Sequence, residues 1–257
     1  PYSIVVSKKQ YNTVTSGLNL NVGASDTIIK GFINLDYQSD WYDAKRKKSF
    51  VHYDMRTDNL PYETSSVDNI FCSHVIEHVE EEHVVKFLKE AHRTLKPGAT
   101  LRLVCPDTSF LWAVSQFDNA YWDWLKSFYR NRSSLDDVSQ LTSADCLTHV
   151  SATRHCKFFD TLHDYNKSNR YTSKSPNLSG DYKAEMDLLT QDLSFDPDYV
   201  STHISWWDFE KLKDNAEKAG FAHVIQSKFQ GSVSAHMRGP NFDRTHPEMS
   251  LYVECIK

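Results

Sequence analysis

Short apolar segments alternate with longer polar or helical segments along residues 18–105. Branched and aromatic side chains dominate the apolar segments, a pattern that predicts β-strands. Strands that alternate with helices are typical of a parallel sheet covered by helices. We therefore expect strands at residues 18–22, 32–36, 50–53, 69–72 and 101–105.

A helix is predicted over residues 80–95, between the fourth and fifth strands. Its apolar side chains recur at helical spacing, and three consecutive glutamates at its start complement the positive end of the helix dipole. The sequence Lys96-Pro97-Gly98 follows directly. Proline cannot continue the helix and glycine permits a turn, so we expect the helix to end here and the chain to re-enter the sheet.

The alternation stops after residue 105, and aromatic residues gather between residues 110 and 129. We expect residues 106–204 to form an inserted helical or loop-rich cap within one domain of residues 1–257. A substrate lid and an accessory layer over one sheet edge both fit this composition. Ser205 is expected to cap the next helix, which Gly220 ends, and two last strands are expected at residues 221–229 and 251–256.

Composition narrows the range of partners. The chain has 257 residues, of which 40% are hydrophobic, and a formal net charge of -5 at pH 7, which disfavours nucleic acid as a partner. No apolar run approaches the ~18 residues of a membrane span, so we expect no membrane partner and a cytoplasmic location. The five cysteines are scattered without a Cys-x-x-Cys pair, which indicates reduced thiols.

Candidate chemistry lies where the predicted strands end. Gly23 follows the first strand, Asp36 ends the second, Asp54 follows the third and His74 follows the fourth. Ligands of open α/β sheets bind outside the carboxyl ends of the strands, so these residues should converge. Glycine allows close approach of the backbone to a ligand, and an acid can accept hydrogen bonds from both hydroxyls of a ribose. The pattern therefore predicts a site for an adenosine-containing cofactor.

In several segments the chain resembles the class I S-adenosylmethionine-dependent methyltransferases, specifically the small-molecule group with a Leu-Asn-Leu-Gly-Cys-Gly motif. The resemblance covers residues 18–105 and 205–257. The matching segments are Leu18 to Gly23, Gly31 to Asp36, Asp54 with Leu60-Pro61-Tyr62, Ser73 to Val79, Leu95-Lys96-Pro97-Gly98, and Ala219-Gly220-Phe221.

This resemblance implies a Rossmann-like, mostly parallel sheet of seven strands with an antiparallel last strand, flanked by helices, with the helical insertion after strand five. It implies S-adenosylmethionine as cofactor, and methyl transfer to an oxygen or nitrogen of a small-molecule acceptor. By resemblance, Asn21 and Gly23 would approach the methionine part, Asp36 would hold the ribose, Asp54 and Met55 would frame the adenine, and Ser73 and His74 would border the methyl group.

The chain departs from the family at two places. Asn21 replaces the first glycine of the motif; asparagine tolerates left-handed backbone angles, so we expect the loop to survive. Only eight residues separate Gly23 from Phe32, fewer than a parallel crossover helix needs. The first helix should be very short or absent, which leaves the amino-acid end of the cofactor less enclosed.

His74 and His203 are the candidate catalytic bases, whereas we expect packing or hydrogen bonding for His78. The histidines and acids of the insertion, His155, Asp160, His163 and Asp164, lack a tight ligand spacing, so we expect no metal.

Two alternative functions share parts of this pattern. A nicotinamide oxidoreductase would need the Gly-x-Gly-x-x-Gly fingerprint, which is missing. A non-catalytic binding or scaffolding protein with a decayed cofactor loop is the second alternative, and Asn21 is its main support. The sequence leaves the oligomeric state open.

Overall fold

The computed structural model describes residues 17–25, 27–39, 50–117, 119–130, 140–156 and 174–257. Its strands are β1 (Asn19–Val22), β2 (Ile33–Asp36), β3 (Val51–His52), β4 (Val67–Ser73), β5 (Leu95–Pro106), β6 (His223–Gln226) and β7 (Ser250–Ile256). Its α-helices are α2 (Glu81–Thr94), α3 (Thr108–Phe117), α4 (Asp123–Arg130), α5 (Ser143–Ser151), α7 (Tyr182–Thr190) and α8 (Phe209–Lys218). Short 3-10 turns are η1 (Ile76–His78), η2 (Asn119–Trp122), η4 (Thr153–His155), η5 (Pro197–Tyr199) and η6 (Ala235–Met237).

The strands form one seven-stranded sheet in the order β3-β2-β1-β4-β5-β7-β6. All neighbours are parallel except β7, which runs antiparallel to both β5 and β6. The predicted Rossmann-like, mostly parallel sheet and its antiparallel last strand are therefore confirmed. The observed β3 and β6 are shorter than the strands expected from the sequence.

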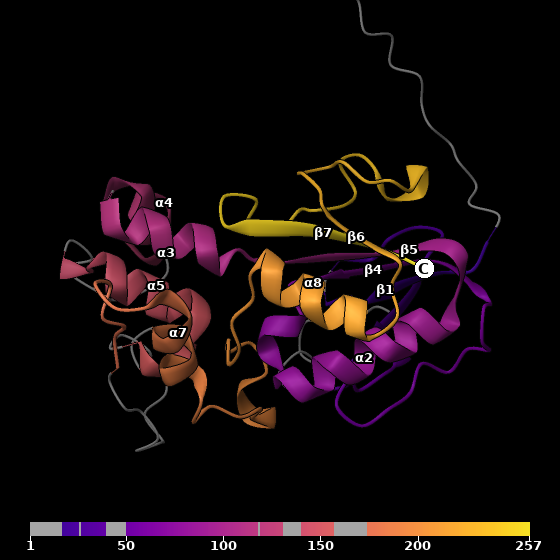
Figure 1. Ribbon diagram of the computed structural model, residues 1–257, viewed down its shortest axis with the longest axis horizontal. Coiled ribbons are helices and arrows are strands. Elements are labelled where there is room, and N and C mark those ends of the chain that lie inside the picture. Colours follow the sequence, from indigo (N-terminus) through magenta and orange to yellow (C-terminus); the bar gives the residue numbers. More distant parts are fainter. Residues whose placement is uncertain (1–16, 26, 40–49, 118, 131–139, 157–173) are drawn as a thin grey trace, which may run out of the picture.

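The main hydrophobic core lies between one face of the sheet and the helices α2 and α8 (Figure 1). Leu20 and Val22 of β1 point into this core together with Phe87 and Leu88 of α2. Helix α2 ends at Thr94, directly before the Lys-Pro-Gly sequence, as expected. The chain joins β5 at once, and Gly98 has φ +76 in an irregular stretch of the pairing with β4.

The opposite face of the sheet is covered by the segment between β6 and β7, which packs Met237 and Phe242 against Phe71. A buried ion network fixes this segment. The Arg102 guanidinium of β5 donates to Asp243 Oδ1 at 3.0 Å through Nε, and to Glu254 of β7 through Nη1. None of these three side chains is accessible to solvent.

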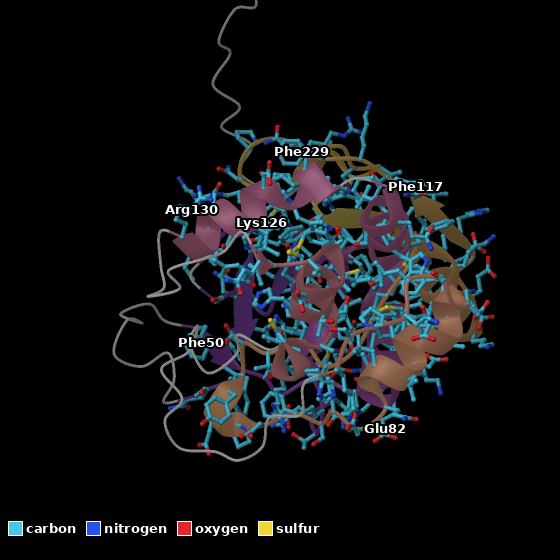
Figure 2. All side chains as sticks on the ribbon, turned by 90° about the vertical axis from the view of Figure 1, so that its left-hand side faces the viewer. Phe50, Glu82, Phe117, Lys126, Arg130 and Phe229 are labelled. Carbon is cyan, nitrogen blue, oxygen red and sulfur yellow. The ribbon has the colours of Figure 1, made fainter. Side chains whose placement is uncertain are left out.

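The helices α3 to α7 follow β5 and lie beyond the end of the sheet (Figure 1). They have a core of their own, built around Trp122, Leu147 and Met186. Figure 2 views the molecule from this end, with Phe117 of α3 and Arg130 of α4 on the inserted helices. A helical insertion after the fifth strand was expected and is present.

Two local expectations need correction or refinement. Asp208, not Ser205, caps α8, because the Asp208 carboxylate accepts a hydrogen bond from the Lys211 backbone at 2.7 Å. The Ser205 hydroxyl instead donates to the carbonyl of Ile76 at 3.0 Å. The described residues between β1 and β2 contain no helix, in agreement with the short connection. In the part of the chain that the structure covers, no helix has the length and apolar character needed to cross a membrane.

Candidate active site

The carboxyl ends of the central strands open onto a cavity of about 490 Å³. This volume lies within the ~300–1,000 Å³ typical of small-molecule sites. Every site residue predicted from the sequence lines this cavity: Asn21, Gly23, Asp36, Asp54, Met55, Ser73, His74 and His203. These residues therefore lie together, as expected from the strand ends, and their contacts are described next.

Gly23 lines the cavity, and its backbone lies close to the side chain of Val75. Its φ is +71, and a Cβ atom added there would lie 2.1 Å from Cγ2 of Val75. The Gly23 and Ala24 amides both donate to the carbonyl of Leu35, at 2.9 and 3.1 Å. Glycine is therefore required at this position both by the backbone angle and by the neighbouring side chain.

Asn21 preserves the loop for a different reason from the one expected. The residue lies within β1 and is not left-handed, so the expectation based on left-handed angles was wrong. Its buried side-chain amide donates to the carbonyl of Thr27 and to Oδ1 of Asn34, both at 2.8 Å. These two hydrogen bonds tie the loop after β1 to β2, a contact that glycine could not make.

Asp36 holds the same loop from the end of β2. Its Oδ2 accepts a hydrogen bond from the Ser25 backbone at 2.6 Å, and its Oδ1 accepts one from the Tyr37 backbone at 2.7 Å. The carboxylate is thereby oriented on the cavity wall.

Asp54 is tied to Arg56, a residue that the sequence analysis did not single out. The Arg56 guanidinium donates to both carboxylate oxygens of Asp54, at 3.0 and 2.7 Å. Burial acts to raise the pKa of Asp54, but the hydrogen bonds from Arg56 outweigh it and hold the pKa below its ordinary value. Arg56 also stacks 3.6 Å over the ring of Phe195, so this wall joins the sheet to the end of the insertion.

His74 follows Ser73 at the end of β4 and has a positive φ of 53. Its Nε2 lies 2.9 Å from the Ser250 hydroxyl. Because that hydroxyl donates its hydrogen to the carbonyl of His246, Nε2 is the donor to Ser250. Its Nδ1 lies 2.9 Å from Glu77 Oε1. Burial acts to raise the pKa of Glu77, yet the charge and the hydrogen bond of His74 lower it to about 2. His74 is thus fixed at both ring nitrogens.

His203 reaches the cavity from the segment before α8. Its Nδ1 lies 2.6 Å from the carbonyl of Val150, and its ring packs edge-on against His78 with centroids 4.7 Å apart. Burial, reinforced by the neighbouring His78, lowers the pKa of His203 to about 4. His78 itself contacts the carbonyl of Thr202 at 3.0 Å through Nδ1, which confirms the hydrogen-bonding role expected for it.

Of the four insertion residues considered as metal ligands, His155 is the one that the structure describes, and it lies away from the cavity. His155 lies 3.1 Å from Asp192 Oδ1, and it is not among the residues that line the cavity. Asp160, His163 and Asp164 lie outside the described residues.

The far wall of the cavity comes from elements whose contribution the sequence did not reveal. Trp124 and Phe128 of α4 face His246 and Met249 of the segment before β7. The aromatic run was visible in the sequence, but its pairing with a segment more than a hundred residues later was not. The cavity therefore has a polar wall along the sheet and an aromatic wall beneath the insertion.

Residues 22–103 match the family model of a methyltransferase domain. No curated protein gives a significant match. Among solved structures, the S-adenosylmethionine-dependent methyltransferase SibL in its apo form aligns with 96% of the chain at 11% identity and a TM-score of 0.41. The chain spans only 52% of that protein.

A SAM-dependent methyltransferase from Archaeoglobus fulgidus aligns over 94% of the chain and 86% of its own length, at 12% identity and a TM-score of 0.43. An S-adenosylmethionine-dependent methyltransferase from Mesorhizobium loti aligns over 93% and 90%, at 14% identity and a TM-score of 0.41. At such identities and TM-scores these structures transfer no residue role or substrate to the chain.

Proposed function

We propose that the chain is a class I S-adenosylmethionine-dependent methyltransferase and that it methylates an oxygen or nitrogen atom of a small-molecule acceptor; the match of residues 22–103 to the methyltransferase-domain model supports this. The observation that carries the proposal is the continuity of the cavity. Gly23 and Asp36 line one side of it and Trp124 and Phe128 line the other, within about 490 Å³. An enclosed site with an aromatic wall suits a compact apolar or sugar-like acceptor.

The residues along the sheet fit the cofactor. Gly23 presents only backbone to the cavity, because the side chain of Val75 occupies the space that a Cβ would need, and Asp36 offers a carboxylate for ribose hydroxyls. When bound, S-adenosylmethionine supplies a methyl group on a sulfonium. We assign Asn21 to holding the loop around the methionine part, and Asp54 with Met55 to framing the adenine.

The residues at the end of β4 and in the insertion would serve the acceptor. Direct displacement at a sulfonium requires the acceptor atom to be aligned with the methyl group, so orientation supplies much of the rate enhancement. Ser73 and His74 border the region where the acceptor atom meets the methyl group. Contacts with Glu77 and Ser250 fix the His74 ring, which would orient the acceptor. His203 also lines this space, and the hydrogen bond from its Nδ1 to the carbonyl of Val150 orients its ring. In this proposal the inserted helices α3, α4, α5 and α7 belong to the cap over this space.

Calorimetry with S-adenosylmethionine and S-adenosylhomocysteine tests the cofactor assignment. Binding should be lost in Asp36→Ala and kept in Asp214→Ala, which removes an exposed carboxylate on α8. Equal binding by both variants would refute the role of Asp36, and no binding by the unaltered chain would refute the proposed activity.

Transfer of a radiolabelled methyl group tests the acceptor class. A panel of hydroxylated and amine-bearing small molecules should include labelled products, whereas RNA and protein fractions should remain unlabelled. Label found only in macromolecules would contradict a small-molecule acceptor.

A further inference from the structure

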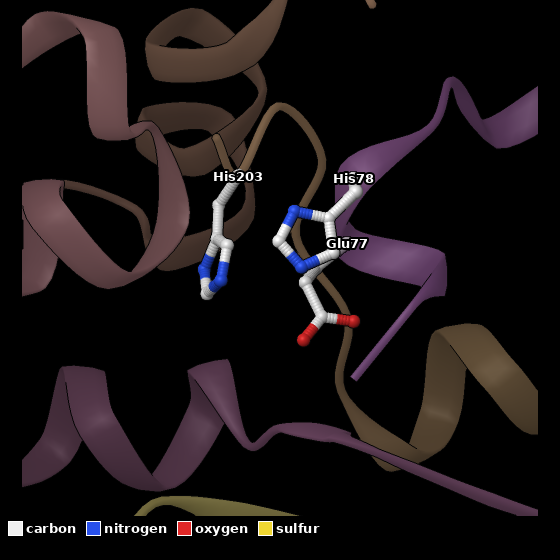
Figure 3. A group of neighbouring side chains, drawn as sticks. All are labelled: Glu77, His78 and His203. Carbon is white, nitrogen blue, oxygen red and sulfur yellow. The ribbon is translucent and has the colours of Figure 1, made fainter. Parts of the chain in front are cut away.

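Three potential metal ligands from two distant segments converge beside the cavity. Glu77 and His78 belong to η1, directly after β4, and His203 lies before α8. One ligand atom from each side chain lies within 4.8 Å of the other two. Figure 3 shows both imidazole rings and the carboxylate directed into a common space.

The two histidines have the hydrogen bonds that metal-binding histidines require. Nδ1 of His78 lies 3.0 Å from the Thr202 carbonyl, and Nδ1 of His203 lies 2.6 Å from the Val150 carbonyl. A carbonyl oxygen can only accept, so each Nδ1 carries the proton and each Nε2 keeps its lone pair. A backbone carbonyl on the opposite ring nitrogen is the usual way in which a metal-binding histidine is oriented.

Glu77 supplies a carboxylate with unmet hydrogen-bonding capacity. The side chain is 1% exposed, and its Oε2 has no hydrogen-bond partner among the residues that the structure describes. Its Oε1 lies 2.9 Å from His74 Nδ1, and no comparable ion pair involves Oε2 within the described chain. Burial of a carboxylate oxygen without a hydrogen bond destabilises the fold, and a bound cation would offset this destabilisation.

Backbone hydrogen bonds hold the two ligand-bearing segments together. The amides of Ile204 and Ser205 donate to the Glu77 carbonyl at 2.8 and 3.2 Å. The residues next to His203 are thereby attached to η1. The ligands are thus presented by a cross-linked backbone, and the arrangement does not depend on flexible surface side chains.

We propose that Glu77, His78 and His203 bind one divalent transition-metal ion, of which Zn²⁺ is the expected species. Two imidazoles and one carboxylate form a ligand set for Zn²⁺ and its neighbours rather than for Mg²⁺, which prefers oxygen ligands. Tetrahedral Zn²⁺ with bonds of about 2.0–2.1 Å needs ligand atoms roughly 3.3 Å apart, so the side chains must close in by about 1–1.5 Å.

Three protein ligands leave at least one coordination position open. His78 and His203 both line the cavity, so that position faces the space assigned to the acceptor. An oxygen or nitrogen atom bound there would be polarised by the metal. The pattern was hidden in the sequence because His203 is far from the other two ligands along the chain.

Metal titrations of the full chain, freed of metal by a chelator, test the site without reference to methyl transfer. Calorimetry should detect one Zn²⁺ per chain, and Co²⁺ should give visible absorption bands that Zn²⁺ abolishes. Glu77→Gln, His78→Gln and His203→Gln should each weaken Zn²⁺ binding by at least about tenfold. Each variant should melt near the unaltered chain in the absence of metal; if Glu77→Gln fails to fold, the two histidine variants decide.

His83→Gln is the matched control, because His83 on α2 lies 3.7 Å from Glu80 and 3.9 Å from Glu82 but outside the cluster. This variant should bind Zn²⁺ as the unaltered chain does. Absence of stoichiometric binding by the unaltered chain, or an equal loss in His83→Gln, would overturn the proposal. Loss of metal binding with intact cofactor binding would leave the methyltransferase assignment standing.

Discussion

Replacement of Gly23 by alanine combines two separate costs whose sizes follow from the structure. A φ of +71 costs an L-residue about 1–2 kcal/mol. The added Cβ would also lie 2.1 Å from Val75 Cγ2, and relief of such overpacking costs about 1–3 kcal/mol. The free energy of unfolding should therefore fall by about 2–5 kcal/mol in Gly23→Ala.

Urea denaturation of a double-mutant cycle with Val75→Ala separates the two costs. In the Val75→Ala background the 2.1 Å overlap is removed and the closest contact that remains is the Cβ of residue 75 at 3.2 Å, so the cost should approach the backbone cost of about 1–2 kcal/mol. Gly98→Ala is the matched control, because Gly98 has φ +76 but an added Cβ would meet nothing within 4 Å. If Gly23→Ala and Gly98→Ala cost the same, or if Val75→Ala brings no relief, the close approach at Gly23 is not a constraint.

Three further predictions concern the loop, the ion network and acid stability. Asn21→Gly, which restores the family glycine, should lower the free energy of unfolding by about 1–3 kcal/mol because two buried hydrogen bonds are lost; unchanged urea stability would contradict this. Arg102→Leu should cost about 3–5 kcal/mol because it leaves two buried carboxylates unpaired, whereas Lys96→Leu, at an exposed ion pair, should cost less than about 1 kcal/mol. The lowered pKa of Asp54 stabilises the fold above its ordinary pKa, and this contribution is lost as the pH falls through the lowered value. Acid titration of stability should therefore be steeper for the unaltered chain than for Asp54→Asn, and parallel curves would refute the assignment.

The sequence predicted the sheet and its functional edge because both depend on local patterns. Apolar segments mark the strands, and parallel strands place their carboxyl ends at a common edge whatever else surrounds them. Gly23, Asp36, Asp54 and His74 therefore had to converge once the strand order was known. Helix α2 and its end could also be predicted, because the spacing of apolar residues and the Lys-Pro-Gly sequence are local signals.

The contacts that define the chemistry are long-range and were not predictable in the same way. Arg56 lies only two residues beyond Asp54, yet its stacking on Phe195 depends on where the insertion returns to the sheet. Likewise, the placement of His203 beside Glu77 depends on backbone hydrogen bonds between two segments far apart in sequence. The apolar pattern of the strands does not predict such long-range contacts, because each contact forms only when distant segments have folded together.

Asn21 illustrates how a departure from a family pattern can be structural. Leu20 and Val22 of β1 point into the core with α2, so Asn19 and Asn21 point to the opposite face of the sheet. There Asn69 donates to Asn19 Oδ1 at 2.7 Å, and Asn21 donates to Asn34 Oδ1 at 2.8 Å.

These amide pairs satisfy buried polar groups across three adjacent strands. They also anchor a connection to β2 that is too short for a crossover helix. The asparagine is therefore explained by the loss of that helix. Asn21 therefore has a structural role beside Gly23 and Asp36, and calorimetry with Asp36→Ala decides between the proposed cofactor site and a decayed loop.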